Sequence, residues 1–440
     1  MPLPELPGTA PDAPVAAPLV VAEVPRQDSL PAVSRRYVLL LMLAGLGTSM
    51  AFVAGSAYSL AIRIQQLAPG QAEVLGYITG LGGVVSLIAT PLVGVLSDRT
   101  RSRWGRRRPF LVAGTLLGLL AQVVLGLAPN IVVLGAGWLL AALGYGQVLG
   151  TIGSLQADKL PEHQRGKVSG LTGTAQLLAP VLGVALATTL VGSSVLLFLV
   201  PGLAGLVLII PLWIWAADAD TRKSELPSEH LTVARLFGKY LFDPRRYPDF
   251  AWNGLGRFAF YCGLYFNTTY MTFFIAQHQN ADVTAVGGVV VALGGAGVIA
   301  TALGALGGGM LSDRLRRRRL FVLLSGALFA FGAVLMVSSS GLVPLIVGSA
   351  FTNLGMGVFA AVDQAIVLDV LPSREEAGRY LGIINYTQQL PHALAPLAAG
   401  GLLAIGAADG TKNYDLVYLV GGALTLVGGA IVMAKVRKSR

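Results

Sequence analysis

The sequence predicts an all-α membrane protein with twelve transmembrane helices, arranged as two parallel repeats of six. Three observations support this class: the chain is very apolar, its apolar residues gather in long runs, and parts of its first half recur in its second half. Of the 440 residues, 54% are hydrophobic and only 12% are charged, whereas charged residues make up about 25% of a soluble globular chain. Cys262 is the single cysteine, so a disulfide framework is excluded.

The apolar runs have the length of membrane-spanning helices. A helix needs roughly 20 apolar residues to cross about 30 Å of hydrocarbon, because each backbone N–H and C=O must be paired within the segment. The runs are too long for β-strands and do not alternate with a period of two. We expect twelve spans, at 37–62, 74–96, 109–129, 131–155, 168–191, 195–215, 250–275, 284–311, 320–338, 341–368, 380–406 and 416–434.

The basic residues indicate how these spans are oriented. With the N-terminus in the cytoplasm, 29 of the 32 Lys and Arg residues lie on the cytoplasmic side, and only Arg63 and Lys412 lie on the other. The positive-inside rule therefore predicts a multi-pass protein of the cell membrane with both termini cytoplasmic. The net charge of +10 follows from this orientation and does not indicate a nucleic-acid partner.

An internal duplication relates the two halves. Three short motifs recur in the same order at offsets of 211 to 216 residues, and the longest is identical at five of six positions. Parallel repeats of this kind are related by an axis along the membrane normal. The recurring pairs are 94–99 with 309–314, 158–161 with 369–372, and 179–180 with 395–396.

The repeats and the polar segments divide the chain into five parts. The proline-rich start is expected to be a disordered cytoplasmic tail. Within the central linker, the apolar residues of 231–240 share one helical side, so this segment is either an amphipathic helix against anionic lipids or a solvated linker helix packed on the bundle. The parts are the tail at 1–34, a six-helix bundle at 35–215, the linker at 216–249, a second bundle at 250–435 and a cytoplasmic tail at 436–440.

The loop after the second span carries a family signature. Twelve helices in two repeats, with Gly-x-Leu-x-Asp-Arg from Gly94 and a basic cluster behind it, resemble the major facilitator superfamily of secondary transporters. The segment 97–110, Ser-Asp-Arg-Thr-Arg-Ser-Arg-Trp-Gly-Arg-Arg-Arg-Pro-Phe, is similar to the glycoside-pentoside-hexuronide and sucrose transporter branch. The resemblance implies the fold and transport by alternating access.

Two charged features of related transporters are missing from this chain. Where plant-type sucrose transporters carry an acidic and a basic residue in the fourth span, this chain has Ala142 and Gly153. The acidic pair of sodium-coupled relatives in the second span is missing too, since 74–96 holds no charge. The coupling ion and the substrate therefore do not follow from the resemblance.

The family motif predicts a gate. In the family, such an Asp-Arg element forms a cytoplasmic latch that holds the outward-open state, and its glycine allows close helix approach. The alternative is that the arginines serve only to set the topology. The candidate gating residues are Gly94, Asp98, Arg99, Gly105, Arg106, Arg107, Gly309, Asp313 and Arg314.

Charged residues within a span are candidates for function, because placing them there costs roughly 2.5 to 3.5 kcal/mol. Three ionisable residues lie inside the spans, all in the second half: Arg257, Asp363 and His392. Asp363 is a candidate ion-pair partner of Arg257, a proton carrier or a cytoplasmic gate. His392 is a candidate hydrogen-bonding group, a proton carrier or a packing residue.

Polar residues follow helical spacing around these charges. Amides, phenols and flat rings suit a neutral sugar, which needs many directional hydrogen bonds, although single polar residues also serve to link helices. The candidate substrate-binding residues are Asn253, Arg257, Tyr261 and Tyr265 in the seventh span and Asn385, Gln388, Gln389 and His392 in the eleventh. Weaker rows occur in the fifth span, with Gln176, and in the tenth, with Asn353.

The sequence thus predicts a monomeric secondary transporter that moves a sugar or glycoside together with protons. A proton-coupled exporter of drugs or metabolites is the alternative. No nucleotide-binding loop, metal-ligand spacing or nucleophile motif occurs, so we expect neither an enzyme nor a cofactor or metal site.

Overall fold

The computed structural model describes residues 31–215, 220–222, 242–373, 376–405 and 412–437. Most of the predicted N-terminal tail, the amphipathic segment 231–240 and the last three residues lie outside the described part. Every regular element in the described part is a helix. In chain order these are α1 (Arg35–Ala54), η2 (Gly55–Ser59), α2 (Leu60–Leu67), α3 (Glu73–Asp98), α4 (Arg108–Leu127), α5 (Ile131–Lys159), α6 (Glu162–Thr188), α7 (Ser194–Trp215), α9 (Pro248–Thr269), α10 (Met271–His278), α11 (Gly287–Leu315), α12 (Arg318–Val337), α13 (Leu342–Asp369), α14 (Ala377–Leu402) and α15 (Tyr414–Lys435).

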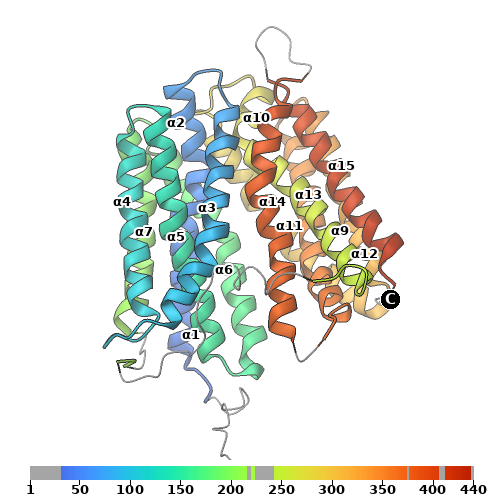
Figure 1. The fold of residues 1–440 in the computed structure, drawn as a ribbon. Helices are drawn as coiled ribbons and strands as arrows, with labels where there is room; N and C mark the ends of the chain where they lie inside the picture. The colour runs from blue at the N-terminus through green and yellow to red at the C-terminus, as the bar shows by residue number, and fades with distance from the viewer. Residues whose placement is uncertain (1–30, 216–219, 223–241, 374–375, 406–411, 438–440) are drawn as a thin grey trace, which may run out of the picture.

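These helices form the twelve spans of an all-α membrane fold, because α1, η2 and α2 together make the first span and α9 with α10 makes the seventh (Figure 1). Ten spans in the described residues are long and apolar enough to cross a membrane by composition alone. The other two, α9 with α10 and α14, fall outside this apolar set, and they carry the predicted substrate-binding residues.

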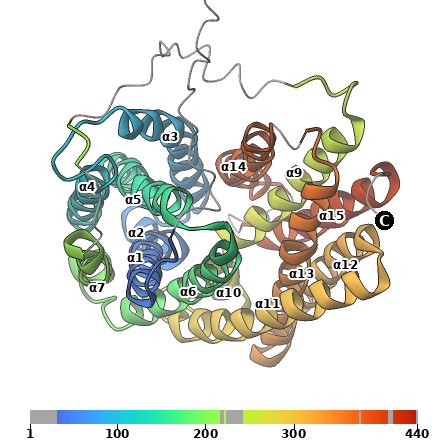
Figure 2. The same ribbon diagram turned by 90° about the horizontal axis from the view of Figure 1, so that it is seen from below.

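The two halves use the same set of helix contacts, which confirms the duplication. In the first half α1 packs on α6 and α7, and α4 packs on α5 and α7. The second half repeats this with α9 on α14 and α15, and with α12 on α13 and α15. Figure 2 shows the two bundles side by side around a central region bordered by α3, α14, α6 and α11.

Two contacts between the halves obey the same symmetry: α3 packs on α14, and α6 packs on α11. We call the end of the bundle where α1 begins and α15 ends the basic end, because most of the arginine-rich loops lie there. The α3–α14 contact involves the first residues of α3 and the last part of α14, so it lies toward the opposite end.

Glycines allow α3 and α14 to approach each other closely. A Cβ atom on Gly83 would lie 2.7 Å from Cα of Ala393, and one on Gly80 would lie 2.8 Å from the carbonyl oxygen of the same residue. Toward the basic end of α3, by contrast, a Cβ on Gly94 would meet no atom within 4 Å. The two halves are therefore in close contact at the opposite end and separated near the basic end of α3.

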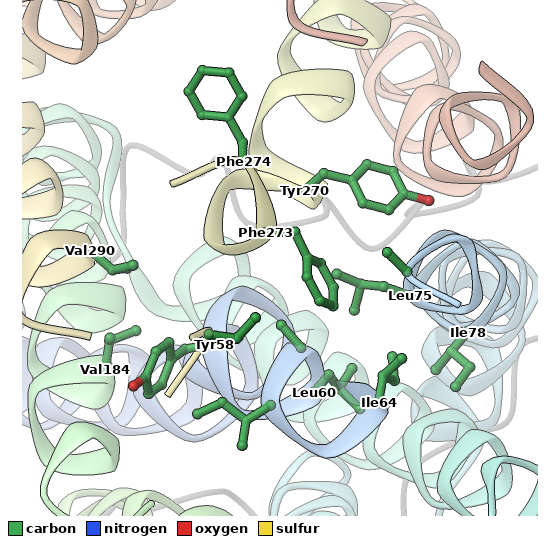
Figure 3. Close-up of a cluster of buried hydrophobic side chains, with 14 of the residues drawn as sticks. Tyr58, Leu60, Ile64, Leu75, Ile78, Val184, Tyr270, Phe273, Phe274 and Val290 are labelled. Atoms are coloured by element: carbon green, nitrogen blue, oxygen red, sulfur yellow. The ribbon is translucent and has the colours of Figure 1, made fainter. Parts of the chain in front are cut away.

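An apolar cluster adds to the contact at the opposite end, which we call the closed end (Figure 3). Phe273 from the second half points at Leu75 from the first, near Leu60, while Tyr270 and Phe274 of the same cluster point to either side, and all five side chains are buried. Burying such side chains stabilises the contact by about 1.5–3 kcal/mol each. The cluster is the main apolar connection that the described residues provide between the halves.

The first span contains a π-helical turn, η2, which lies at this junction. The Tyr58 hydroxyl donates to the carbonyl oxygen of Thr284 at 3.2 Å, and the Thr272 hydroxyl donates to the carbonyl oxygen of Ala57. Single π turns inside α-helices are frequent at functional sites. Here the turn supplies both a donor and an acceptor to the other half.

In one loop at the closed end, hydrogen bonds shift the pKa of an acidic side chain, Asp282. The Asp282 carboxylate accepts hydrogen bonds from the backbone N–H of Thr284 at 2.8 Å and from its hydroxyl at 2.6 Å. These hydrogen bonds lower the pKa of Asp282. They also fix the loop whose carbonyl group receives the hydrogen bond from Tyr58.

Candidate functional site

The helix α9 carries a polar face that runs toward the middle of the bundle. Asn253, Arg257, Tyr261 and Tyr265 recur every four residues and therefore share one side of the helix. Asn253 is 1% exposed, and its side-chain Nδ2 has no hydrogen-bond partner among the described residues. The face thus combines a buried amide, a guanidinium group and two phenols.

Arg257 forms a buried ion pair with Asp363 of α13. The two residues are only 4% and 5% exposed, and the Arg257 Nε also donates to the hydroxyl of Thr387 on α14 at 3.0 Å. Breaking a buried pair by removing one partner costs about 3–5 kcal/mol, because the other charge is left unpaired. The pair therefore ties three helices of the second half together at one point.

Thr387 was not predicted as a site residue. It lies on the side of α14 that packs against α9, where Ile384 is also buried, and not on the polar side of α14. Its neighbours at helical spacing, Ile384 and Pro391, are apolar, so Thr387 does not extend a polar row along the helix. Only the spatial position of Arg257 reveals its role.

Aromatic rings continue the site from the ion pair toward the closed end. The guanidinium carbon of Arg257 lies 5.7 Å from the ring centroid of Tyr261, and this ring meets Phe359 edge-on at 5.5 Å. The next ring, Tyr265, lies 5.0 Å from the imidazole of His392 on α14. The structure therefore brings Arg257, Tyr261 and Tyr265 next to the two predicted ionisable residues of the other helices.

The polar side of α14 is exposed between its two packing faces. Asn385, Gln388 and Gln389 are exposed, and Gln388 lies near the Tyr265 hydroxyl. Leu390 and Leu394 are exposed on another side of the helix, as expected for residues in contact with lipid. Because α14 borders the central region (Figure 2), its polar side faces the space between the halves.

The predicted gating residues form a charged cluster at the basic end of the first half. The Asp98 carboxylate accepts from Arg107 Nη2 at 2.6 Å, and Asp158 accepts from Nε of the same arginine at 3.0 Å and from Arg106 Nη2 at 2.9 Å. Gly105 has a φ of +81°, a conformation that favours glycine, and it turns the chain so that Arg106 and Arg107 point back at Asp98.

The second half repeats this cluster in equivalent positions. Arg318 donates to Asp313 at 3.1 Å and to Asp369 at 2.8 Å. Asp158, Arg318 and Asp369 were not predicted to pair, although the repeat offset of 211 residues relates Arg107 to Arg318 and Asp158 to Asp369. Applying that offset to the basic residues would have identified the second cluster.

Other predicted gating residues make fewer contacts in this arrangement. Gly309 would place a Cβ at an ordinary 3.6 Å from Ala361, and Arg314 is exposed. Arg99 ends α3 and its backbone N–H closes the last turn. The ion pairs named above all join residues of the same half, so the role of these motifs as a latch between the halves stays a prediction.

The sequence matches the family model of the Major Facilitator Superfamily over residues 37–306 and again over 254–440. The chain belongs to the major facilitator superfamily. Its two overlapping matches cover all twelve spans, in agreement with the duplicated six-helix fold.

Among curated relatives, the chain resembles the sucrose transporter branch of this superfamily. It is 31% identical over 114 residues to a "General alpha-glucoside permease" of Schizosaccharomyces pombe, covering 25% of this chain and 20% of that protein. It is 36% identical over 84 residues to "Sucrose transport protein SUT1" of Oryza sativa subsp. japonica, covering 18% of this chain and 15% of that protein. The matched segments thus span a fifth or less of these relatives.

Solved structures of the same fold extend over nearly the whole chain. The nucleoside transporter NupG superposes with a TM-score of 0.72 at 12% identity, covering 91% of this chain and 99% of that one. A bacterial homologue of the human lysosomal transporter Spinster, in an inward-facing and unoccupied conformation, gives 0.64 at 14% identity, covering 91% and 95%. At these identities the likeness establishes the fold.

Proposed function

We propose that this protein is a proton-coupled symporter that moves a sugar or glycoside into the cell by alternating access. The observation that supports it most is the buried Arg257–Asp363 pair beside a wall of phenol, imidazole and amide groups. Such a wall suits a neutral, hydroxyl-rich substrate, because it offers directional hydrogen bonds and flat rings without a net charge.

The ion pair supplies a proton-binding group. Protonation of Asp363 removes the negative charge that holds Arg257, and the guanidinium group is then free to donate to a substrate hydroxyl. Deprotonation restores the pair and withdraws that donor. Proton binding and sugar binding at neighbouring atoms are coupled in this scheme by a shared partner.

The names of the matched relatives support a sugar over other neutral substrates. Those proteins are described as α-glucoside and sucrose carriers, and the shared segments are short. We therefore take the α-glucoside class, which includes sucrose and maltose, as the first substrates to test.

The arrangement of the halves corresponds to one state of the cycle in this proposal. The positive-inside rule places the basic end in the cytoplasm, with both termini there. Packing of α3 on α14 at the opposite end then closes the outer side, and the site opens inward. In the outward-open state, the clusters around Asp98 and Asp313 would instead hold the cytoplasmic end together.

The proposal also covers the oligomeric state of the protein, its membrane and its lipid partners. The protein acts as a monomer in the plasma membrane, and anionic lipids of the cytoplasmic leaflet attract its basic loops. The superfamily fold and the positive charge of the cytoplasmic loops support this placement.

Uptake measurements in whole cells test the proposal. Cells that express the protein should accumulate labelled sucrose, maltose or methyl α-glucoside while the external medium becomes more alkaline. Asp363→Asn should abolish the proton movement and accumulation, because the amide cannot carry a proton between the two sides. A matched control is Gln364→Asn, which changes the neighbouring exposed side chain only.

Other outcomes identify the alternatives. Uptake of sugar that is insensitive to pH and survives Asp363→Asn would assign the pair a structural role and leave a uniporter. No uptake of any sugar, together with raised resistance to hydrophobic toxins, would replace the symporter with an exporter of drugs or metabolites.

A further inference from the structure

A hollow of about 340 Å³ lies at the basic end of the first half, where α1 begins and where α5 and α7 end. Arg36 and Tyr37 line it from the first turn of α1, Lys159 is the last residue of α5, and Trp215 is the last residue of α7. We call this space the α1–α7 hollow. All its lining residues belong to the first half, so it lies apart from the polar faces of α9 and α14.

The α1–α7 hollow carries two positive charges. Arg36 and Lys159 both line it, and none of the described residues in its wall is acidic. Asp158, the acidic neighbour of Lys159 in the chain, accepts from Arg106 at 2.9 Å and from Arg107 at 3.0 Å, and therefore belongs to the gating cluster. The charge of the hollow is thus complementary to an anion.

Aromatic rings lie against both cations. The guanidinium carbon of Arg36 is 4.6 Å from the ring centroid of Trp215, and the ammonium nitrogen of Lys159 is 5.6 Å from that of Tyr37. A ring face attracts a cation without replacing its hydrogen bonds to oxygen atoms. Arg36 is not needed to cap α7, because Arg108 already donates to the Ile214 carbonyl at 3.4 Å.

The hollow lies at the depth of the lipid headgroups. Trp215 is 52% exposed and ends an apolar span, the position at which tryptophan gathers at a membrane–water interface. On α1 the wall continues to Leu40, one turn deeper along the span than Arg36. The wall therefore changes from cationic to apolar along the direction in which a phospholipid changes from phosphate to acyl chain.

The duplication places a related hollow in the second half. The tripeptide Arg-Arg-Tyr at 35–37 recurs at 245–247, an offset of 210 residues, immediately before α9. That second hollow has a volume of about 570 Å³ and is lined by two basic and two acidic residues: Arg246, Arg379, Asp243 and Glu376. Glu376 also pairs with Arg379 at 2.8 Å. The two hollows share a motif, but only the α1–α7 hollow has an excess of positive charge.

We propose that the α1–α7 hollow binds the headgroup of an anionic phospholipid in the cytoplasmic leaflet, with Arg36 and Lys159 on the phosphate oxygens and Trp215 beside the acyl chains. The inference rests on the orientation given in the proposed function and adds a specific lipid site to it. Its apolar wall favours a lipid over a free phosphate ion, which has nothing to place against Leu40 and Trp215.

Lipid binding to the purified protein tests the proposal. The protein in detergent is mixed with phosphatidylglycerol or with phosphatidylcholine of the same acyl chains, and the complexes are counted by native mass spectrometry. The wild type should bind one phosphatidylglycerol at least about fivefold more tightly than phosphatidylcholine, since each basic residue near an anionic headgroup contributes about this factor. Inorganic phosphate should not displace the lipid any better than chloride at equal ionic strength does.

Variants locate the binding in the α1–α7 hollow. Arg36→Gln and Lys159→Gln should each weaken phosphatidylglycerol binding by about fivefold and leave phosphatidylcholine binding unchanged. The matched control is Arg246→Gln, which removes the corresponding arginine of the second hollow, also exposed and 5.6 Å from a tyrosine ring. It should leave phosphatidylglycerol binding within about twofold of the wild type, because that hollow has no excess positive charge.

Two further measurements keep a folding defect apart from a lost lipid contact. Each variant's unfolding temperature in detergent without added lipid should match that of the wild type. Lys159→Arg, which keeps the charge, should retain the affinity that Lys159→Gln loses. If Arg36→Gln does not fold, the lipid preference of the wild type and the two Lys159 variants still decide the proposal.

Other results would overturn it. Equal binding of the two lipids by the wild type would remove the anionic site, and an equal loss in Arg36→Gln and Arg246→Gln would replace it with general surface charge. Displacement by inorganic phosphate would assign the hollow to a free anion. Any of these leaves sugar transport standing, because binding is measured without sugar or a pH gradient. Absence of sugar uptake with selective lipid binding would overturn the proposed function alone.

Discussion

At the basic end of the bundle, Asp98 pairs with Arg107 at 2.6 Å within the first half, whereas at the opposite end Glu73 pairs with Lys412 of the second half at 2.8 Å. The basic end thus uses its charges inside each half. The opposite end adds an ion pair to a contact that already consists of closely packed helices and buried rings.

In the proposed cycle, this difference between the two ends would set the balance of free energy between the two states. Packing at the closed end depends on shape, since Gly80 and Gly83 let α3 lie against α14 with little tolerance for an added atom. At the basic end the contacts are ion pairs of partly exposed carboxylates: Asp98 has Arg107 at 2.6 Å and Arg106 at 3.8 Å, and Asp313 has Arg318 at 3.1 Å. In the proposed cycle, opening the end at which α3 packs on α14 and closing the basic end would exchange a geometric contact for an electrostatic one.

The largest effect is expected from Gly83→Val. The new side chain would collide with Cα of Ala393, and overpacking of this kind costs about 1–3 kcal/mol. The closed end should then open, and transport should fall by about tenfold or more. A cysteine placed by Gln388→Cys in a Cys262→Ser background reports this change. When a membrane-impermeant thiol reagent is applied from the basic side, the cysteine should be labelled more slowly with Gly83→Val than without it, because the basic end closes as the other end opens.

Gly401→Ala is the control for this substitution. Gly401 lies in α14 near the same contact, but a Cβ there would meet no atom within 4 Å. Its transport should match the wild type. Wild-type transport in Gly83→Val would show that close packing of α3 on α14 is dispensable.

A smaller effect is expected from Asp98→Asn. The substitution weakens a hydrogen bond to a charged group, which contributes about 1.5–3 kcal/mol when buried and less here because the carboxylate is 44% exposed. Transport should fall severalfold while the protein still inserts, as measured by initial uptake rate against the amount in the membrane. Asp313→Asn should have a weaker effect, because that carboxylate is 65% exposed. Unchanged turnover in Asp98→Asn would count against a latch.

The smallest effect is expected from Glu73→Gln, which removes the ion pair with Lys412 at the closed end. Both side chains are about a quarter exposed, and pairs of this kind contribute about 0.2–1 kcal/mol. The uptake rate should change by less than about fivefold, and the change should shrink in high salt. A double-mutant cycle with Lys412→Gln measures the coupling, and a coupling above that range would show that the closed end is held mainly by charge.

Most of the fold could be predicted from the sequence because hydropathy reports membrane crossing directly. All twelve spans are present, but the fifth begins at Glu162 and not at 168. His163, Gln164 and Arg165 continue that helix beyond the apolar run, where hydropathy gives no signal. The break between α9 and α10 at Tyr270 was not predicted either, because no proline or glycine marks it.

The candidate site could be predicted only in part. Helical spacing and the rarity of charge in the spans pointed to Arg257 and Asp363, and the structure joins them. Thr387 was missed because it lies on the packing side of α14, and its hydrogen bond from Arg257 appears only in the coordinates. Gln176 and Asn353, from the weaker rows, line a cavity of about 310 Å³ between the two halves.

The π-helical turn at 55–59 also sets the phase of the first span. An α-helix turns by 100° per residue, so the one additional residue that a π turn accommodates offsets α2 against α1 by about that angle. Arg63, which donates to the Ala128 carbonyl at 2.6 Å, depends on this offset. Deleting one residue within 55–59 would rotate Arg63 away from that carbonyl while leaving every residue before the turn in place. The first span therefore behaves as two helices, α1 and α2, which are rotated relative to each other about the helix axis. Each of them presents its side chains to a different set of neighbours.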